Sequence, residues 1–318
     1  MILTVTPNPA VDLTWHVPRL SRGGTHRVSP AVARAGGKGI NVARVLHELG
    51  HDVLALATAG GSTGEQFTAD LDESGIPYQL IATGSATRLS AAIVEEEPAE
   101  TAIFNEDGTP LTRVEGERLA AAAEAHARSA AAVAISGSLR AGFGPDELRH
   151  VVERVARWAP VVVDTSGPGI LSAADGGAHV LKPNREELRA ATGLDDPGEG
   201  ARRLLARGAR LVIVSSGPDG LLLVAASGDV ISARLPFALR GNATGAGDAL
   251  VAAIAAGLAS GVDLLSSDDA AHTARLSLAR RAAAWSGAAV LMPLAGELSP
   301  EHLTLEHDVV VTSRRGAA

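Results

Sequence analysis

Short apolar runs alternate along the chain with longer stretches whose apolar residues recur at helical spacing. Short runs rich in Val, Ile and Leu are typical of buried strands, and helical spacing is typical of helices that bury one face. The runs predict strands at residues 2–6, 53–58, 76–81, 131–135, 161–164, 211–214, 221–225, 230–235 and 308–312. The spacing predicts helices within 35–50, at 65–74, 116–129, 145–158, 184–192, 197–208 and 266–286, and directly after Gly247. Strands that alternate with helices predict an α/β fold with a doubly wound, mainly parallel sheet flanked by helices.

Two segments near the start, residues 12–17 and 25–34, alternate polar and apolar positions before any helix begins. Residues 86–94 and 101–105 predict a β-hairpin across the acidic turn Glu95–Glu97. We expect these ribbons to form a small β-sheet lid, contributed by about residues 9–34 and 86–106. The chain has no internal repeat and no low-complexity linker, so residues 1–318 are interpreted as one domain.

Composition excludes several classes of protein. The chain has no cysteine, which excludes disulfides and thiolate metal sites. Its net charge of −8 and the lack of a basic tract argue against a nucleic-acid partner. No apolar run is long enough to predict a transmembrane helix, and the first residues are typical of a strand and not of a signal peptide. We therefore expect a cytoplasmic protein without a membrane partner.

Lysine and asparagine are rare in a chain rich in Ala and Arg. Lys and Arg together number 28, yet the lysines are only Lys38 and Lys182. Each lies within three residues of an asparagine, in the motifs GGKGIN and KPN. Lysine is a compact point charge and arginine a planar fork, so the two are not equivalent at a phosphate. The two lysines are candidates for contacts that arginine cannot make.

The stretch GNATGAGDALVAAIAAGLASG, residues 241–261, joins a glycine-rich turn to an apolar helix. Glycines let backbone N–H groups surround an anion, and a helix N-terminus adds unpaired donors and a positive dipole end. Asp248 follows that turn and suits a base that takes a proton from a hydroxyl beside a phosphate. The alternative is that Asp248 caps a helix after a tight turn.

Other glycine-rich or polar motifs follow predicted strands: SGSL, DTSG, KPN and SSGPDG. Ligands of doubly wound sheets bind beyond the carboxyl ends of the strands, so this clustering favours a ligand site over simple capping. GGKG opens a helix but matches neither GxxxxGK[ST] nor GxGxxG. A Rossmann-type reductase is accordingly disfavoured.

With these motifs in order, the chain resembles the ribokinase-like PfkB carbohydrate kinases, and more narrowly their 1-phosphofructokinase and tagatose-6-phosphate kinase branch. The resemblance covers about residues 1–290 and rests on NPAVD, GGKGINVARVL, TR, SGSL, DTSG, LKPNxxEL, VSxGPDG and GAGD. The chain departs from the usual pattern in three places, since Ala243, Arg140 and Ala249 stand where hydroxyl residues, proline and serine are usual.

The resemblance implies a role for each matching residue. Asp248 would be the catalytic base, and Gly245, Ala246 and Gly247 the anion hole. The sugar would be held by Asp12, Gly37, Lys38 and Asn41, and its phosphate approached by Arg27, Arg88 and Ser138. The nucleotide side would be lined by Lys182, Asn184, Ser215, Gly217 and Gly220, with Glu187 organising Mg²⁺.

The resemblance thus implies an ATP-dependent and Mg²⁺-dependent kinase that phosphorylates fructose 1-phosphate, tagatose 6-phosphate or fructose 6-phosphate. Two cations in the lid, Arg27 and Arg88, suit an acceptor that already carries a phosphate. A kinase of an unphosphorylated sugar or nucleoside is the alternative enzyme. A catalytically silent sugar-phosphate-binding protein is the alternative from another class, and Asp248 argues against it. In relatives the lids often pair, which implies a homodimer formed through the lid.

Overall fold

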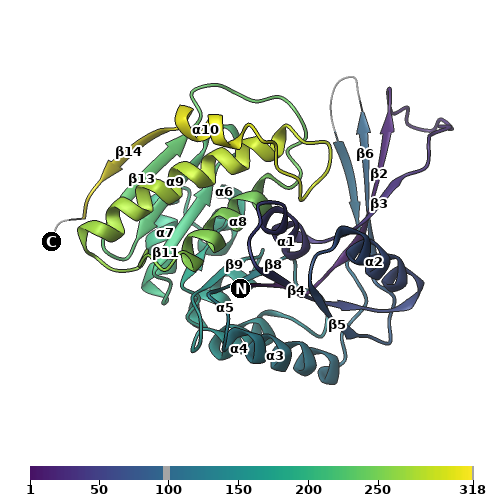
Figure 1. Cartoon of the computed structure of the whole chain (residues 1–318), viewed down its shortest axis with the longest axis horizontal. Coiled ribbons are helices and arrows are strands. Elements are labelled where there is room, and N and C mark those ends of the chain that lie inside the picture. Colours follow the sequence, from purple (N-terminus) through teal and green to yellow (C-terminus); the bar gives the residue numbers. More distant parts are fainter. Residues whose placement is uncertain (96–100, 317–318) are drawn as a thin grey trace.

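A ten-stranded sheet forms the centre of the computed structural model, which describes residues 1–95 and 101–316 (Figure 1). Across the sheet its strands are β14 (Val310–Arg314), β13 (Val230–Arg234), β12 (Leu221–Ala225), β11 (Leu211–Ser215), β10 (Val180–Leu181), β9 (Val161–Asp164), β8 (Ala132–Ser136), β1 (Ile2–Thr6), β4 (Val53–Ala59) and β5 (Tyr78–Ala82). From β5 to β11 every neighbouring pair is parallel, and β12, β13 and β14 add an antiparallel edge. β1 therefore lies inside the sheet, between β8 and β4.

Helices cover both faces of this sheet, each over its own apolar core. One core holds residues of α1 (Lys38–Glu48), α2 (Gly61–Ser74), α8 (Ala246–Ala259), α9 (Asp269–Val290) and α10 (His302–Asp308). The other holds residues of α3 (Arg113–Ala127), α4 (Pro145–Val155), α5 (Gly169–Asp175), α6 (Arg185–Thr192) and α7 (Pro197–Ala206). Along β8, Ala132 and Ala134 join the first core while Val133 and Ile135 join the second. This alternation is that of a strand buried on both faces, and it confirms the predicted doubly wound α/β fold.

A second sheet of four strands stands beside α1 and α2 (Figure 1). Its order is β3 (Val32–Gly36), β2 (Ala10–Val17), β6 (Arg88–Glu95) and β7 (Thr101–Asn105). β2 pairs antiparallel with β3 and parallel with β6, and β6 pairs antiparallel with β7. Part of the predicted turn Glu95–Glu97 lies outside the described residues.

The predicted ribbon at residues 25–34 is wrong in its first half. Only Val32–Gly36 forms a strand, and residues 21–30 are exposed without regular structure. Gly23 and Gly24 favour a turn there, and Pro30 has no N–H to donate to a ladder. The alternation in this segment therefore reflects exposed loop residues and not a strand.

The predicted helices are present, with boundaries that shift by a few residues. α3 begins at Arg113 because Thr112 and Glu115 form a capping box: the Thr112 Oγ1 accepts from the Glu115 N–H. α5 and α10 were not predicted, since each has seven residues and too few turns for a periodic pattern. No helix in the described part of the chain is long and apolar enough to span a membrane.

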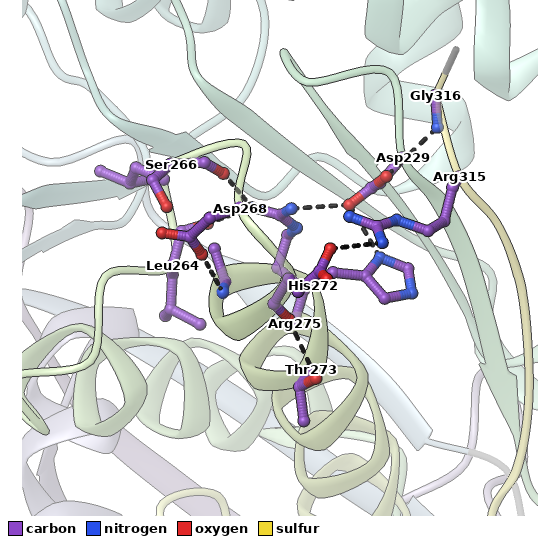
Figure 2. Close-up of polar contacts among 12 residues, drawn as sticks. Asp229, Leu264, Ser266, Asp268, His272, Thr273, Arg275, Arg315 and Gly316 are labelled. Carbon is purple, nitrogen blue, oxygen red and sulfur yellow. Dashed lines mark hydrogen bonds and ion pairs between the residues drawn. The ribbon is translucent and has the colours of Figure 1, made fainter. Parts of the chain in front are cut away.

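A buried polar cluster ties the antiparallel edge to α9 (Figure 2). Arg275 is fully buried, and its Nη2 donates to Asp229 Oδ2 at 2.6 Å. His272 Nδ1 lies 2.8 Å from the same oxygen, and the Gly316 N–H donates to Asp229 Oδ1 at 3.2 Å. Burial opposes ionisation of Asp229, but these hydrogen bonds outweigh it and lower its pKa to about 2. The cluster therefore joins the start of β13, α9 and the segment after β14.

Candidate active site

A cavity of about 990 Å³ opens where the carboxyl ends of the parallel strands meet the small sheet. Its polar lining comes from the ends of β1, β8, β9, β10 and β11 and the loops that follow them, from α1, α6 and α8, and from the small sheet. These residues include Asn8, Asp12, Lys38, Asn41, Arg88, Asn105, Ser138, Arg140, Asp164, Lys182, Asn184, Glu187, Ser215, Gly245 and Asp248. The sheet topology thus gathers the strand-end motifs at one place, as expected for ligand sites of open α/β sheets.

The glycine-rich turn before α8 forms one wall of this cavity. Gly245 has φ 89°, and a Cβ there would lie 2.9 Å from the Ala295 backbone, so glycine fits and larger residues do not. Asp248 is the third residue of α8 and is only 5% exposed. Its Oδ2 accepts a hydrogen bond from Asn41 Nδ2 at 2.8 Å.

The pKa of Asp248 reflects these surroundings. Burial raises it to about 7, because the nearby Lys38 and the Asn41 amide only partly restore the ionised form. Asp164 raises it further by like-charge repulsion, and Lys182 lowers it. A carboxylate with a pKa near neutrality at a helix N-terminus is suited to accept a proton from a hydroxyl.

Asp164, at the end of β9, links the only two lysines of the chain. Lys38 Nζ lies 3.3 Å from both carboxylate oxygens of Asp164, and Lys182 Nζ lies 3.4 Å from Oδ1. Lys38 also lies 4.0 Å from Glu187 Oε1. Asp164 raises the pKa of Lys38, mainly by charge attraction, so this lysine stays protonated. The motif DTSG follows a predicted strand, but nothing in the sequence indicates this role for Asp164.

Glu187 is held by the start of α6. Asn184 Oδ1 accepts from the Glu187 N–H at 2.8 Å, and Glu187 Oε2 accepts from the Asn184 N–H at 2.9 Å. This reciprocal capping box fixes the Glu187 carboxylate with Oε1 on the side of Lys38. Asn184 and Glu187 of the KPNxxE motif thus hold one another in position.

The small sheet contributes the opposite wall. The Asp12 carboxylate packs on Gly36, where a Cβ would collide with it. Burial raises the pKa of Asp12 to about 6, and Arg88 partly offsets this. Arg88 Nε and Nη2 donate to the carbonyl of Asn8 at 3.3 and 3.2 Å, and Ser138 Oγ accepts from Asn8 Nδ2 at 3.1 Å.

Arg27 is the one predicted site residue that lines neither the large cavity nor the smaller apolar pocket beside Ser215. Its side chain is exposed on the irregular segment before β3 and does not line the cavity. The approach of Arg27 to the substrate phosphate stays a prediction, and residues 21–30 do not form the ribbon that was expected to carry it.

A smaller pocket of about 220 Å³ adjoins the large cavity and shares Ser215 with it. It is mostly apolar, and its lining includes Gly217, Gly220, Ala246, Phe237, Leu250 and Val290. The predicted residues Gly217, Gly220 and Ala246 therefore lie beside this pocket, while the other predicted residues apart from Arg27 line the large cavity.

The sequence profile of the pfkB family carbohydrate kinases matches residues 7–286. The chain belongs to this family. It is 37% identical over 266 residues to "1-phosphofructokinase" of Xanthomonas campestris, covering 80% of this chain and 83% of the relative. It is 38% identical over 278 residues to "ATP-dependent 6-phosphofructokinase isozyme 2" of Mycobacterium tuberculosis, covering 84% and 80%.

Solved structures agree with the family assignment. Phosphofructokinase-2 from Escherichia coli, in complex with potassium, superposes with a TM-score of 0.86 at 28% identity, over 96% of this chain and 98% of that one. The resemblance stated from the motifs is therefore confirmed, and this carbohydrate kinase uses ATP as its co-substrate, as the family implies.

Proposed function

We propose that this carbohydrate kinase is a sugar-phosphate kinase that transfers the γ-phosphoryl group of ATP to a hydroxyl of a ketohexose monophosphate, giving the bisphosphate and ADP. The observation that carries the proposal is Asp248, a buried carboxylate at the N-terminus of α8 with a pKa of about 7. Relatives called 1-phosphofructokinase and 6-phosphofructokinase support the substrate class. The candidate acceptors are fructose 1-phosphate, tagatose 6-phosphate and fructose 6-phosphate.

In the proposed mechanism Asp248 takes the proton of the attacking hydroxyl. Its ionised form is populated above about pH 7, and Asn41 orients it through the hydrogen bond to Oδ2. The backbone N–H groups of residues 245–247 and the dipole of α8 stabilise negative charge that develops on the transferred group. Lys38 adds a fixed positive charge on the same side of the cavity.

The small sheet acts as a lid over the acceptor. Asp12 is a hydrogen-bond acceptor for sugar hydroxyls, and Arg88 is a cation for a phosphate group. A closed lid excludes water, which would otherwise compete with the sugar hydroxyl for the phosphoryl group. We assign the adenine ring of ATP to the apolar pocket beside Gly217 and Gly220, and its phosphates to the large cavity near Lys182 and Asn184.

The residues at the nucleotide side fit Mg²⁺. In the described residues no group of three acidic, His or Cys side chains converges on one point. Mg²⁺ does not need such a group, because it commonly binds through one or two carboxylates together with waters and substrate phosphates. Glu187, whose Oε1 is not used by the capping box, and Asp164 would hold it, directly or through water. When bound, the ion neutralises charge on the ATP phosphates.

Steady-state kinetics with a panel of acceptors tests the proposed function. One phosphorylated ketohexose should exceed free fructose, ribose and adenosine in kcat/KM by at least about tenfold, the value of one charge-assisted contact to Arg88. Asp248→Asn should lower kcat by about 10²–10⁴-fold and leave acceptor binding intact. A free sugar or nucleoside that matches the best phosphate would assign the chain to the other kinase class. Sugar-phosphate binding without turnover would point to the silent binding protein.

A further inference from the structure

Arg140 lies in the loop after β8, where the chain reads SGSLR and proline is usual in this family. The residue lines the large cavity, yet it is only 8% exposed. Its Nη2 donates to Thr58 Oγ1 at 3.3 Å, and its Nε is buried with no hydrogen-bond partner among the described residues. The loop holds its backbone, since the Phe143 N–H donates to the Arg140 carbonyl at 2.9 Å.

The charge of Arg140 is not compensated by an ion pair. In residues 1–95 and 101–316, the other buried arginines have carboxylate partners: Arg44 pairs with Asp70, and Arg275 with Asp229. Arg140 pairs with none there.

The carboxylate that acts on Arg140 from a distance, Glu115, is already engaged at the start of α3. Its oxygens accept from the Gly84 N–H at 2.7 Å and the Thr112 N–H at 2.8 Å. A buried cation without a partner is costly, so this position favours an anion from outside the chain.

A second guanidinium lies close enough to repel Arg140. Burial lowers the pKa of Arg140 to about 10; Glu115 offsets part of this, and the charge of Arg88 adds to it. Arg88 donates its hydrogen bonds to the carbonyls of Asn8 and Glu106, and the carboxylates of Asp12, Glu106 and Asp107 attract its charge without forming an ion pair with it in the described residues. Arg88 and Arg140 both line the large cavity, and two neighbouring guanidinium groups that form no carboxylate ion pair in the described residues make a site for a multiply charged anion.

We propose that Arg140 is a second guanidinium ligand for the phosphate group that the acceptor already carries, acting beside Arg88. The inference rests on the proposed function and adds a substrate-binding residue that the motif pattern does not predict. The planar fork of arginine can keep Nη2 on Thr58 while its other N–H groups face phosphate oxygens. Arg140 thus adds a buried cation beside Arg88 for this phosphate group.

The test compares Arg140→Gln and Arg140→Lys with wild type, and Arg149→Gln is the matched control, on the exposed side of α4 away from the cavity. Isothermal titration without ATP measures binding of fructose 1-phosphate, tagatose 6-phosphate, fructose 6-phosphate and inorganic phosphate. Arg140→Gln should raise the Kd and KM of the preferred sugar phosphate about 10- to 100-fold and leave the KM of ATP within about twofold. Arg149→Gln should change neither.

Arg140→Lys retains the positive charge, but its affinity for the sugar phosphate should still fall about fivefold. A lysine ammonium cannot reach Thr58 and the phosphate group together. Wild-type binding by the Gln variant, or by the Lys variant should the Gln variant not fold, overturns the inference. So does an equal loss of affinity for ATP and for the sugar phosphate. Failure of the proposed function is a different result: wild type would turn over no sugar phosphate, whatever the effect of Arg140 on phosphate binding.

Discussion

The Asn41–Asp248 hydrogen bond should set the pH at which the enzyme gains activity. The variant Asn41→Leu removes the donor to Asp248 Oδ2 at nearly constant volume. A hydrogen bond to a charged group contributes about 1.5–3 kcal/mol, and one pKa unit corresponds to about 1.4 kcal/mol. Loss of this bond should therefore raise the pKa of Asp248 from about 7 by about 1–2 units, with little screening because the carboxylate is 5% exposed.

In the proposed mechanism the ionised form of Asp248 is the active base, so kcat should rise with pH through its pKa. At pH 7 about half of the wild-type carboxylates are ionised; in the variant the fraction falls to about 1–10%, a loss of about 5- to 50-fold in kcat. At about one pH unit above the variant's pKa, where most of its carboxylates are ionised, the kcat values of the two enzymes should approach each other.

The assay is ADP release at saturating substrates from pH 5.5 to 10. Asn105→Ala, which removes an amide from the lid side of the same cavity, is the control and should leave the acid limb in place. Asp12, with a pKa of about 6, adds a second inflection at lower pH to the profile of kcat against pH, and neither variant should move it. An acid limb that stays in place in Asn41→Leu, with kcat reduced equally at all pH values, would refute Asp248 as the titrating base.

Three further predictions concern the metal, the buried cluster and assembly. Glu187→Gln should raise the Mg²⁺ concentration needed for half-maximal activity, and excess Mg²⁺ should restore part of the rate; a defect insensitive to Mg²⁺ contradicts the role. Asp229→Asn should remove about 2 kcal/mol of unfolding free energy at pH 7, measured by urea denaturation. Because the pKa of Asp229 is depressed in the folded state, this stabilisation is present above the unfolded pKa of about 3.8 and is lost as pH falls toward about 2. A difference in unfolding free energy between wild type and variant that persists at pH 2 would contradict this role of the Asp229 charge. If the lids pair in a homodimer, as we propose, Phe104→Ser on exposed β7 should halve the mass seen by light scattering, whereas an unchanged mass would place the interface elsewhere.

Features encoded by neighbouring residues were predictable from the sequence. Apolar runs and helical spacing indicated the strands and most helices, and the doubly wound fold followed from their alternation. The irregular segment before β3 shows the limit: polar and apolar residues alternate there, but Gly23, Gly24 and Pro30 decide the backbone. Short α5 and α10 carry too few residues for a period to be recognised.

Contacts within the candidate site were predictable where both contacting residues belong to one short sequence motif. Asn184 and Glu187 cap one another within four residues, so their spacing alone brings them together. Asp164 and Arg140 lack such a signal, because their partners come from distant parts of the chain: Lys38 and Lys182 for one, Thr58 for the other. Pairings of this kind depend on the order of strands in the sheet.

The interior position of β1, between β8 and β4, has a consequence for synthesis of the chain. Residues 2–6 are translated early but lie between β4 and β8, so their last neighbour, Ala132–Ser136, is made about 130 residues later. At a translation rate of about 5–20 residues per second, this interval is on the order of ten seconds. Throughout it, an apolar strand that is fully buried in the finished enzyme has an unpaired edge. The β1–β4 pair can form early, whereas the other edge of β1 can pair only after β8 is made, so this edge is open to wrong pairing during synthesis.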